Sequence, residues 1–114
     1  MDQDRNTIGL TPAAVKQLEE IQLKGWFEDA QDGARFAAAY AIRKGVQLAT
    51  LEGVETRWAI GGFDKSGEFR AIMAALYPDI QLPVRAVEYL TNEGLRLVHE
   101  RLVTRGETPA ALLD

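Results

Sequence analysis

The 114-residue sequence contains no cysteine, one histidine and one serine. Without cysteine there is no disulfide framework, no thiolate nucleophile and no zinc knuckle. No apolar run approaches the ~20 residues that a membrane-spanning helix needs. The start, MDQDRN, also lacks the basic and then apolar pattern of a signal peptide. We therefore expect a cytoplasmic protein with no membrane partner.

The few residues that could carry chemistry do not form a catalytic or metal-binding pattern. His99 lies among charged residues and has no second histidine or cysteine, which favours a surface residue over a ligand or base. Ser66, in DKSGE, is better interpreted as a helix cap than as a nucleophile. The stretch EDAQDG lacks the alternating oxygen ligands of a calcium loop, and no phosphate-cradling GxxxxGK is present. We predict that the protein is not an enzyme and holds neither a metal nor a cofactor.

The balance of charge is acidic, with 13 Lys and Arg against 17 Asp and Glu and a net charge of -4. Non-specific affinity for nucleic acid comes mainly from many contacts between Lys or Arg and phosphates. The composition therefore argues against a protein that coats DNA, although a local basic surface on an acidic body remains compatible with it.

The first element that the sequence predicts is a short strand that leads directly into a helix. In TIGL, Thr7–Leu10, the apolar residues Ile8 and Leu10 fall on one face with the period of two of a strand. Thr11-Pro12 then supplies a capping residue and a proline at the first helical position. Apolar residues continue at helical spacing as far as Gly25. Because so short a strand is not stable alone, it needs a partner strand.

A second helix is predicted from EDAQDGARF to about Lys44. Asp29 and Asp32 are candidate caps of its start, and carboxylates there also complement the helix dipole. Arg43 and Lys44 place two cations at its end, where Gly45 can turn left-handed. Its middle, FAAAYAI, is rich in alanine, so we expect another backbone to approach this helix closely.

The second half of the chain predicts one more strand and two further helical stretches. ETRWAIGGFD indicates a strand over Thr56–Ile60 that two glycines end. A third helix starts at Asp64 or Ser66 and carries the apolar stripe Phe69, Ile72, Met73, Leu76 and Tyr77. Another helical stretch opens near Pro83, and the sequence leaves open whether Gly94 breaks it. We expect the tail GETPAALLD to be frayed or weakly docked.

The order strand, helix, helix over about residues 5–45 resembles a ribbon-helix-helix unit, the fold of the Arc and MetJ repressors. In that family two chains donate their strands to one antiparallel ribbon. The resemblance therefore implies that the partner of Thr7–Leu10 is the same strand of a second chain, and that the protein is a homo-oligomer. The implied oligomer interface consists of Ile8, Leu10, Phe36 and Tyr40. The predicted fold class is mainly α with a short N-terminal strand. A single domain over residues 1–114 would combine the ribbon-helix-helix-like unit with a strand and helical extension over residues 46–108.

A narrower resemblance is to DndE, the small subunit linked to bacterial DNA phosphorothioation and its defence systems. It rests on IGLTPAAVKQLEEI, on RFAAAYAIRKG and on ETRWAIGGFD, and covers about the first two-thirds of the chain. The part from about Pro83 onward has no counterpart in the resemblance. What the resemblance implies is a DNA setting within a larger assembly of protein subunits.

The ribbon-helix-helix resemblance further implies that outward strand residues face the DNA major groove. These are Arg5 and Thr7, with Lys16 also near the DNA. Arginine can bind guanine bidentately, and threonine can use its hydroxyl or its methyl group. Gly9, the next outward position, has no side chain with which to read a base. Only two side chains per chain would then supply specificity.

The start of the second helix departs from the family pattern. Ribbon-helix-helix proteins usually hold a phosphate on the backbone amides there, since a helix start is a natural anion site. Glu28, Asp29 and Asp32 occupy this place here, where they would satisfy the amides and repel phosphate. Residues 1–45 contain six basic and seven acidic side chains, so the unit itself is slightly acidic.

Three further residues are candidate partner contacts. Arg57 and Trp58 form a pair that can stack on a base or anchor a protein interface, although such a tryptophan also commonly fills a small core. Trp26 follows the first helix and raises the same alternatives. The function that we predict is a non-enzymatic, DNA-associated accessory subunit of a bacterial DNA-modification or anti-phage defence assembly, oligomerising through its N-terminal strand. The alternatives are a protein-interaction adaptor without DNA contact and a dimeric transcription regulator.

Overall fold

The computed structural model describes residues 4–113. This part of the chain is mainly helical and contains one short antiparallel sheet of two strands, in agreement with the predicted fold class. In chain order the elements are β1 (Thr7–Leu10), α1 (Pro12–Leu23), α2 (Ala30–Arg43), β2 (Glu55–Ala59), α3 (Ile60–Phe63), α4 (Glu68–Leu76), α5 (Pro83–His99), the π-helical turn η1 (Glu100–Thr104) and the 3-10 helix η2 (Pro109–Leu113).

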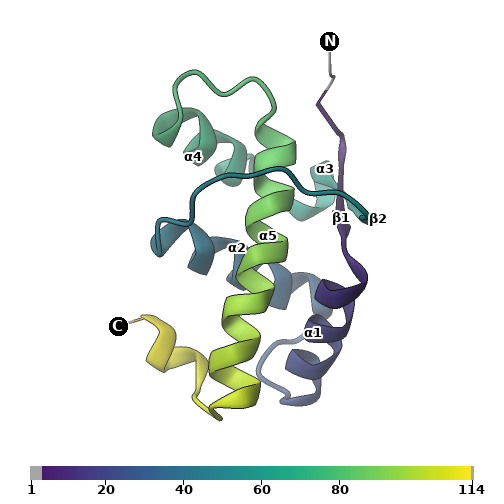
Figure 1. The fold of residues 1–114 in the computed structure, drawn as a ribbon, viewed down its shortest axis with the longest axis vertical. Coiled ribbons are helices and arrows are strands. Elements are labelled where there is room, and N and C mark those ends of the chain that lie inside the picture. The colour runs from purple at the N-terminus through teal and green to yellow at the C-terminus, as the bar shows by residue number, and fades with distance from the viewer. Residues whose placement is uncertain (1–3, 114) are drawn as a thin grey trace.

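The crossing of α2 and α5 organises the fold. Figure 1 shows α5 along the long axis of the molecule, with α2 crossing behind it. The two backbones approach so closely that a Cβ atom added at Gly94 would lie 2.0 Å from the carbonyl oxygen of Ala37. The close approach predicted for the alanine-rich helix is therefore confirmed, and Gly94 does not break α5 but allows the crossing.

Within residues 4–113, the core consists of two clusters of buried apolar side chains. One cluster, which includes Phe63, Met73 and Leu90, joins β1, α3 and α4 to the first half of α5. The other, which includes Leu18 and Leu95, joins α1 and α2 to the second half of α5. The half-buried ring of Trp58 packs against both clusters, so the strand β2 closes the core on one side.

The two ends of α1 and the start of α2 agree with the predictions made from the sequence. The Thr11 hydroxyl accepts a hydrogen bond from the amide of Ala14 at 3.1 Å, which caps α1. The Asp29 carboxylate accepts from the amide of Asp32 at 2.8 Å, which caps α2. Gly25, just beyond α1, has a φ of 75°, a left-handed conformation that glycine adopts without strain.

The second half of the chain differs in detail from the predictions. The strand covers Glu55–Ala59 rather than Thr56–Ile60, because Ile60 already belongs to the helical turn α3. In the apolar stripe of α4 only Met73 is buried, whereas Ile72 is 39% and Leu76 54% exposed. The tail is held more firmly than expected, because η2 places Leu112 in the core with no exposed surface.

The partner of the N-terminal strand is the main correction. β1 pairs antiparallel with β2 of the same chain, with Ile8 opposite Trp58 and a bulge between Ile8 and Gly9. The expectation of a second chain's strand as the hydrogen-bonding partner of Thr7–Leu10 is therefore wrong. The physical reason is that the Trp-containing strand lies beside β1 once α2 and α5 have crossed, and it supplies the ladder that a short strand requires.

Candidate functional site

The outer strand of the β1–β2 ribbon, β2, carries two of the predicted contact residues, Arg57 and Trp58. Four of the five residues of β2 are exposed, and only Trp58 is half-buried. The Trp58 ring faces the core and lies 5.5 Å, centroid to centroid, from the ring of Phe63. The guanidinium of Arg57 lies over the Trp58 ring at 5.5 Å. Arg57 itself is exposed and makes no ion pair with another described residue. Trp58 therefore belongs mainly to the core, whereas the exposed Arg57 remains a candidate contact residue.

The other edge of β1 is covered by polar side chains of α5. The Glu88 carboxylate accepts a hydrogen bond from the amide of Gly9 at 2.8 Å. The side-chain oxygen of Asn92 accepts from the amide of Thr11 at 2.9 Å, and its nitrogen donates to the carbonyl of Gly9 at 3.0 Å. Both side chains are buried, with 2% and 7% exposed surface for Glu88 and Asn92. Since β2 occupies one edge of β1 and these residues the other, β1 has no free edge for a further strand.

Sequence reasoning missed Glu88 and Asn92. A signal was available, because the two polar residues are four positions apart, on one face of a helix, among apolar neighbours. A buried polar group is costly unless it is hydrogen-bonded, and this pattern therefore predicts a partner for both. The pattern does not indicate that the hydrogen-bond partners lie on the backbone of a strand about 80 residues away.

The predicted DNA contacts are separated in the structure. The Nε atom of Arg5 lies 3.6 Å from a carboxylate oxygen of Glu88, and the Arg5 side chain is 37% exposed. Thr7 is half-buried on β1, while Lys16 is exposed on α1. At Gly9 an added Cβ atom would lie 3.0 Å from the side chain of Val54, which covers that outward position of the strand.

The predicted oligomer interface divides into core and surface. Ile8 and Leu10 have no exposed surface within one chain, so they cannot line a seam between two copies while this fold is kept. Tyr40 is buried, and its hydroxyl accepts a hydrogen bond from Arg101 at 3.1 Å. Phe36 is half-buried and packs against Phe27 with ring centroids 5.1 Å apart. Of the four residues, only Phe36 retains a substantial accessible surface.

Several apolar side chains remain exposed. Leu23, the last residue of α1, is 86% exposed, and Trp26 in the connection between α1 and α2 is 48% exposed. Ile72 and Leu76 are exposed on α4. Trp26 therefore remains a candidate partner contact, since an exposed tryptophan is a common anchor of protein interfaces.

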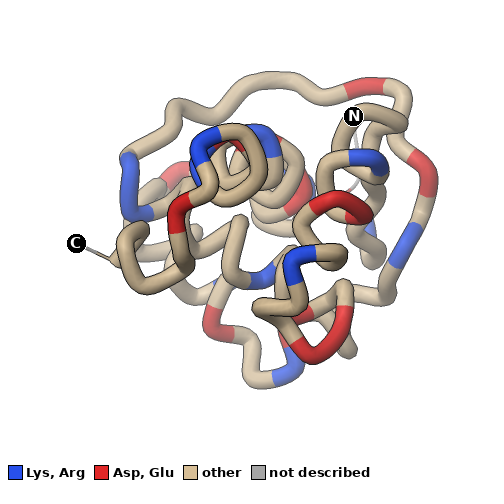
Figure 2. Tube along the Cα trace, turned by 90° about the horizontal axis from the view of Figure 1, so that it is seen from below, with Lys and Arg blue, Asp and Glu red and all other residues tan. Residues whose placement is uncertain are grey.

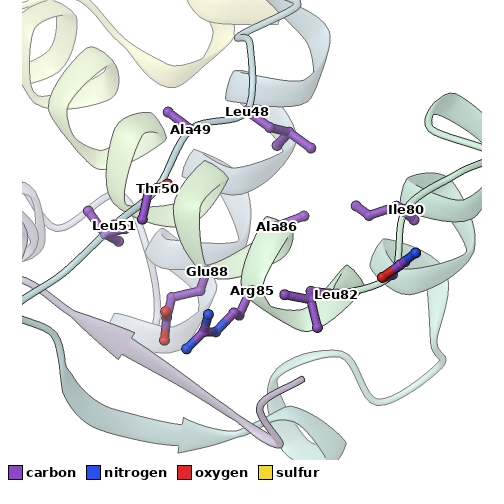
Figure 3. A pocket seen from close by; sticks show the side chains of 10 residues that line it. Leu48, Ala49, Thr50, Leu51, Ile80, Leu82, Arg85, Ala86 and Glu88 are labelled. Carbon is purple, nitrogen blue, oxygen red and sulfur yellow. The ribbon is translucent and has the colours of Figure 1, made fainter. Parts of the chain in front are cut away.

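A half-open pocket of about 350 Å³ lies beside the ribbon (Figure 3). Its walls come from the segment 48–51, from Ile80 and Leu82 ahead of α5, and from the first turns of α5. The walls are mostly apolar, and Arg85 and Glu88 extend from α5 toward β1 (Figure 3). The Glu88 carboxylate at the polar end of this pocket already accepts a hydrogen bond from the backbone of β1. We therefore assign Glu88 a structural role rather than a ligand-binding one.

The turn before α4 is built around a buried carboxylate. Asp64 accepts hydrogen bonds from the amides of Phe69 and Arg70 and from the Arg70 guanidinium, the last at 2.8 Å. Burial raises the pKa of Asp64, but the bonds from Arg70 and from the two amides outweigh that effect, so the pKa lies below its ordinary value. Ser66, the predicted alternative cap, is exposed. The turn is thus a helix start stabilised by Asp64.

The remaining charged side chains are spread over the surface. Figure 2 shows Lys and Arg interspersed with Asp and Glu along the chain. His99 lies 3.4 Å from a carboxylate oxygen of Glu20, in a pair with a single acid. Within residues 4–113, no group of three or more His, Cys, Asp or Glu side chains is arranged to hold a metal ion. No helix of that range is both long and apolar enough to cross a bilayer.

Comparisons with known proteins do not place this chain in a family. No family model, no curated protein and no solved structure matches it.

Proposed function

We propose that this protein is a non-enzymatic, DNA-associated accessory subunit of a bacterial DNA-modification or anti-phage defence assembly. The observation that carries the proposal is the exposed outer strand of the ribbon, β2, on which the Arg57 guanidinium lies over the Trp58 ring without an ion-pair partner among the described residues. Arginine on an aromatic platform is suited both to phosphates and to the faces of bases.

The shape of the ribbon supports the proposal. The DNA major groove admits a two-stranded β-ribbon as well as an α-helix. The order strand, helix, helix over Thr7–Arg43 is compatible with the ribbon-helix-helix resemblance, although β1 pairs here with β2 of the same chain. The likeness of three sequence stretches to DndE suggests the DNA-modification setting. In this proposal both strands of the ribbon belong to one chain. The DNA-facing strand is the exposed β2, whereas in the ribbon-helix-helix family it is the N-terminal strand, which corresponds to β1.

The residues that contact DNA are reassigned accordingly. Arg5 is partly neutralised by Glu88, and the Gly9 position is covered by Val54. Arg57 therefore replaces Arg5 as the principal contact in the proposal, and Thr7 is a neighbour on the inner strand. Lys16, exposed on α1, contributes a phosphate contact if the DNA extends beyond the ribbon.

A binding titration tests the proposal. The protein is titrated against duplex, nicked and single-stranded DNA of the same sequence at two salt concentrations, with fluorescence anisotropy as the readout. We expect measurable affinity at low salt and a weakening of about 5- to 100-fold in Arg57→Ala, the range typical of removing an arginine that binds DNA. If Arg57 binds a phosphate, its removal should also lower the slope of log K against log salt by about one unit.

The matched control is Lys65→Ala, which removes an exposed cation outside the ribbon. This variant should bind like the wild type. Absence of binding to all three DNA forms at low salt would reject the DNA proposal, and equal losses of affinity in the two variants would reject the ribbon as the contact site.

A protein-interaction adaptor is the second candidate, and the exposed apolar residues favour it. Trp26, Ile72 and Leu76 are accessible in the described structure, and the net charge of -4 opposes DNA binding. An adaptor would show no DNA affinity, and its binding to an assembly partner would be abolished in Trp26→Ala or Leu76→Ala but kept in Arg57→Ala.

A further inference from the structure

The outward face of α2 is complementary to itself. Asp32, Phe36, Ala39 and Arg43 follow one another at spacings of four, three and four residues, which places them on one side of the helix. Ala39 and Arg43 are exposed, and Asp32 and Phe36 are half-buried. The opposite side, with the buried residues Ala34, Ala37 and Ala41, packs into the core.

Charge is separated along this face. Asp29 and Asp32 lie at the start of α2, and Arg43 and Lys44 lie at its end. Arg43 makes no ion pair with another described residue. Asp32 pairs with Arg35 at 2.9 Å through one carboxylate oxygen, which leaves acceptor sites on the other. Two such helices would attract each other when they run antiparallel.

We propose that a second copy of this chain docks on this face, with the two α2 helices antiparallel across a two-fold axis. In this register Asp32 of each copy meets Arg43 of the other. Phe36 of each copy meets Ala39 of the other, so that a large side chain faces a small one. Such an interface is isologous and closes as a dimer.

A groove on the same face could accept the Phe36 ring of the second copy. Phe36, Ala39, Tyr40, Arg43, Leu112 and Leu113 line a nearly apolar groove of about 140 Å³. Cavities of roughly that size hold a benzene-sized ring. Leu113, at its rim, is 57% exposed and would be covered by the second copy.

The expected affinity is modest. α2 has 14 residues and so is about 21 Å long at 1.5 Å per residue. One helix face with the neighbouring groove is smaller than the roughly 800 Å² per partner of a standard interface. We therefore expect dissociation in the micromolar range. The inference goes beyond the proposed function and does not depend on DNA binding.

Sedimentation velocity of the full chain over about 5 to 500 µM, the range that suits a small interface, tests the proposal. The wild type should shift from monomer to dimer. Ala39→Glu, which places a charge opposite Phe36 of the other copy, should weaken the dimer at least about 10-fold. The matched control Ala74→Glu changes an exposed alanine on α4 and should leave the equilibrium unchanged.

Charge reversal tests the register. Arg43→Glu opposes Asp32 of the other copy and should weaken the dimer by about 10-fold, since each dimer contains the pair twice. The double variant Asp32→Arg with Arg43→Glu restores opposite charges and should return the affinity to near that of the wild type. Far-UV circular dichroism checks that each variant is folded.

Three results would overturn the inference. If the wild type stays monomeric over the whole concentration range, no second copy docks on this face. A dimer that withstands Ala39→Glu lies on another surface. A double variant that is folded but no tighter than Arg43→Glu alone rejects the antiparallel register.

Discussion

Replacement of Gly94 by alanine would test the α2–α5 crossing directly. The added Cβ atom would lie 2.0 Å from the carbonyl oxygen and 2.5 Å from the carbonyl carbon of Ala37. Ordinary contact begins at 3.4 Å, so the two backbones would have to separate by roughly 1.4 Å. No flexible side chain end is involved, and the strain therefore falls on the packing between the two helices.

The magnitude follows from two opposing effects. At an open helix position, alanine in place of glycine stabilises by about 1 kcal/mol. Overpacking against a backbone costs about 1–3 kcal/mol, and the gaps that opening the crossing leaves in both core clusters cost about a further 2 kcal/mol. We expect a net loss of about 2–4 kcal/mol, a large part of the ~5–15 kcal/mol of a typical domain.

Urea unfolding at 25 °C, followed by far-UV circular dichroism, measures this loss. With a slope of about 1–3 kcal/mol per molar urea, the midpoint should fall by about 1–3 M. Gly61→Ala is the matched control, because an added Cβ atom there meets nothing within 4 Å, and its effect should stay within about 0.5 kcal/mol. A Gly94→Ala protein as stable as the wild type would refute the close crossing.

Three more predictions concern the polar contacts that hold the ribbon and the helix starts. Asp4→Ala removes the carboxylate that accepts hydrogen bonds from the first amides of α5 at 3.0 and 3.1 Å, and should lower the free energy of unfolding by about 0.5–2 kcal/mol, as loss of a cap does. Asn92→Ala removes the links to Gly9 and Thr11, and should cost about 1–3 kcal/mol and speed hydrogen exchange of the Thr11 amide. Asp64 has a lowered pKa in the fold. Its contribution to the free energy of unfolding is therefore full above the unfolded pKa of about 3.9 and is lost as the pH falls through the lower folded pKa. Asp64→Asn removes this titrating group, so the variant should lose less stability than the wild type between about pH 5 and pH 3.

Each of these predictions has a result that contradicts it. An Asp4→Ala protein with an unchanged urea midpoint would mean that this distant cap contributes nothing. If hydrogen exchange of the Thr11 amide is unchanged in Asn92→Ala, the Asn92 side chain does not hold the end of β1 to α5. If Asp64→Asn and the wild type lose equal stability on acidification, the bonds to Arg70 and the α4 amides do not depress the Asp64 pKa.

Local features were predictable because they depend on neighbouring residues. The caps Thr11 and Asp29 and the left-handed Gly25 follow from the chemistry of helix ends. The alanines of α2 correctly indicated a close backbone, although not which segment would supply it. The partner of that approach is Gly94, whose role could be assigned only once α5 was seen to cross α2.

The candidate site was less accessible to sequence reasoning. Arg57 and Trp58 were identified as a pair, and the structure places them as an exposed cation on a half-buried ring. Arg5 was chosen by analogy with the ribbon-helix-helix family, and its pairing with Glu88 could not be foreseen because 83 positions separate the two. Ile8 and Leu10 were correctly identified as strand residues on a buried face, but that pattern does not distinguish burial within one chain from burial between two.

The sequence by itself determined the main helical segments, the caps Thr11 and Asp29 and the alternation of Ile8 and Leu10, because these depend on side chains a few residues apart. Only the tertiary structure decided that β2 pairs with β1 and that Glu88 and Asn92 cover its other edge. The reason is physical: the buried backbone groups of β1 need hydrogen-bond partners, and either another strand or polar side chains can supply them. Which groups do so depends on how the α2–α5 crossing brings distant segments together.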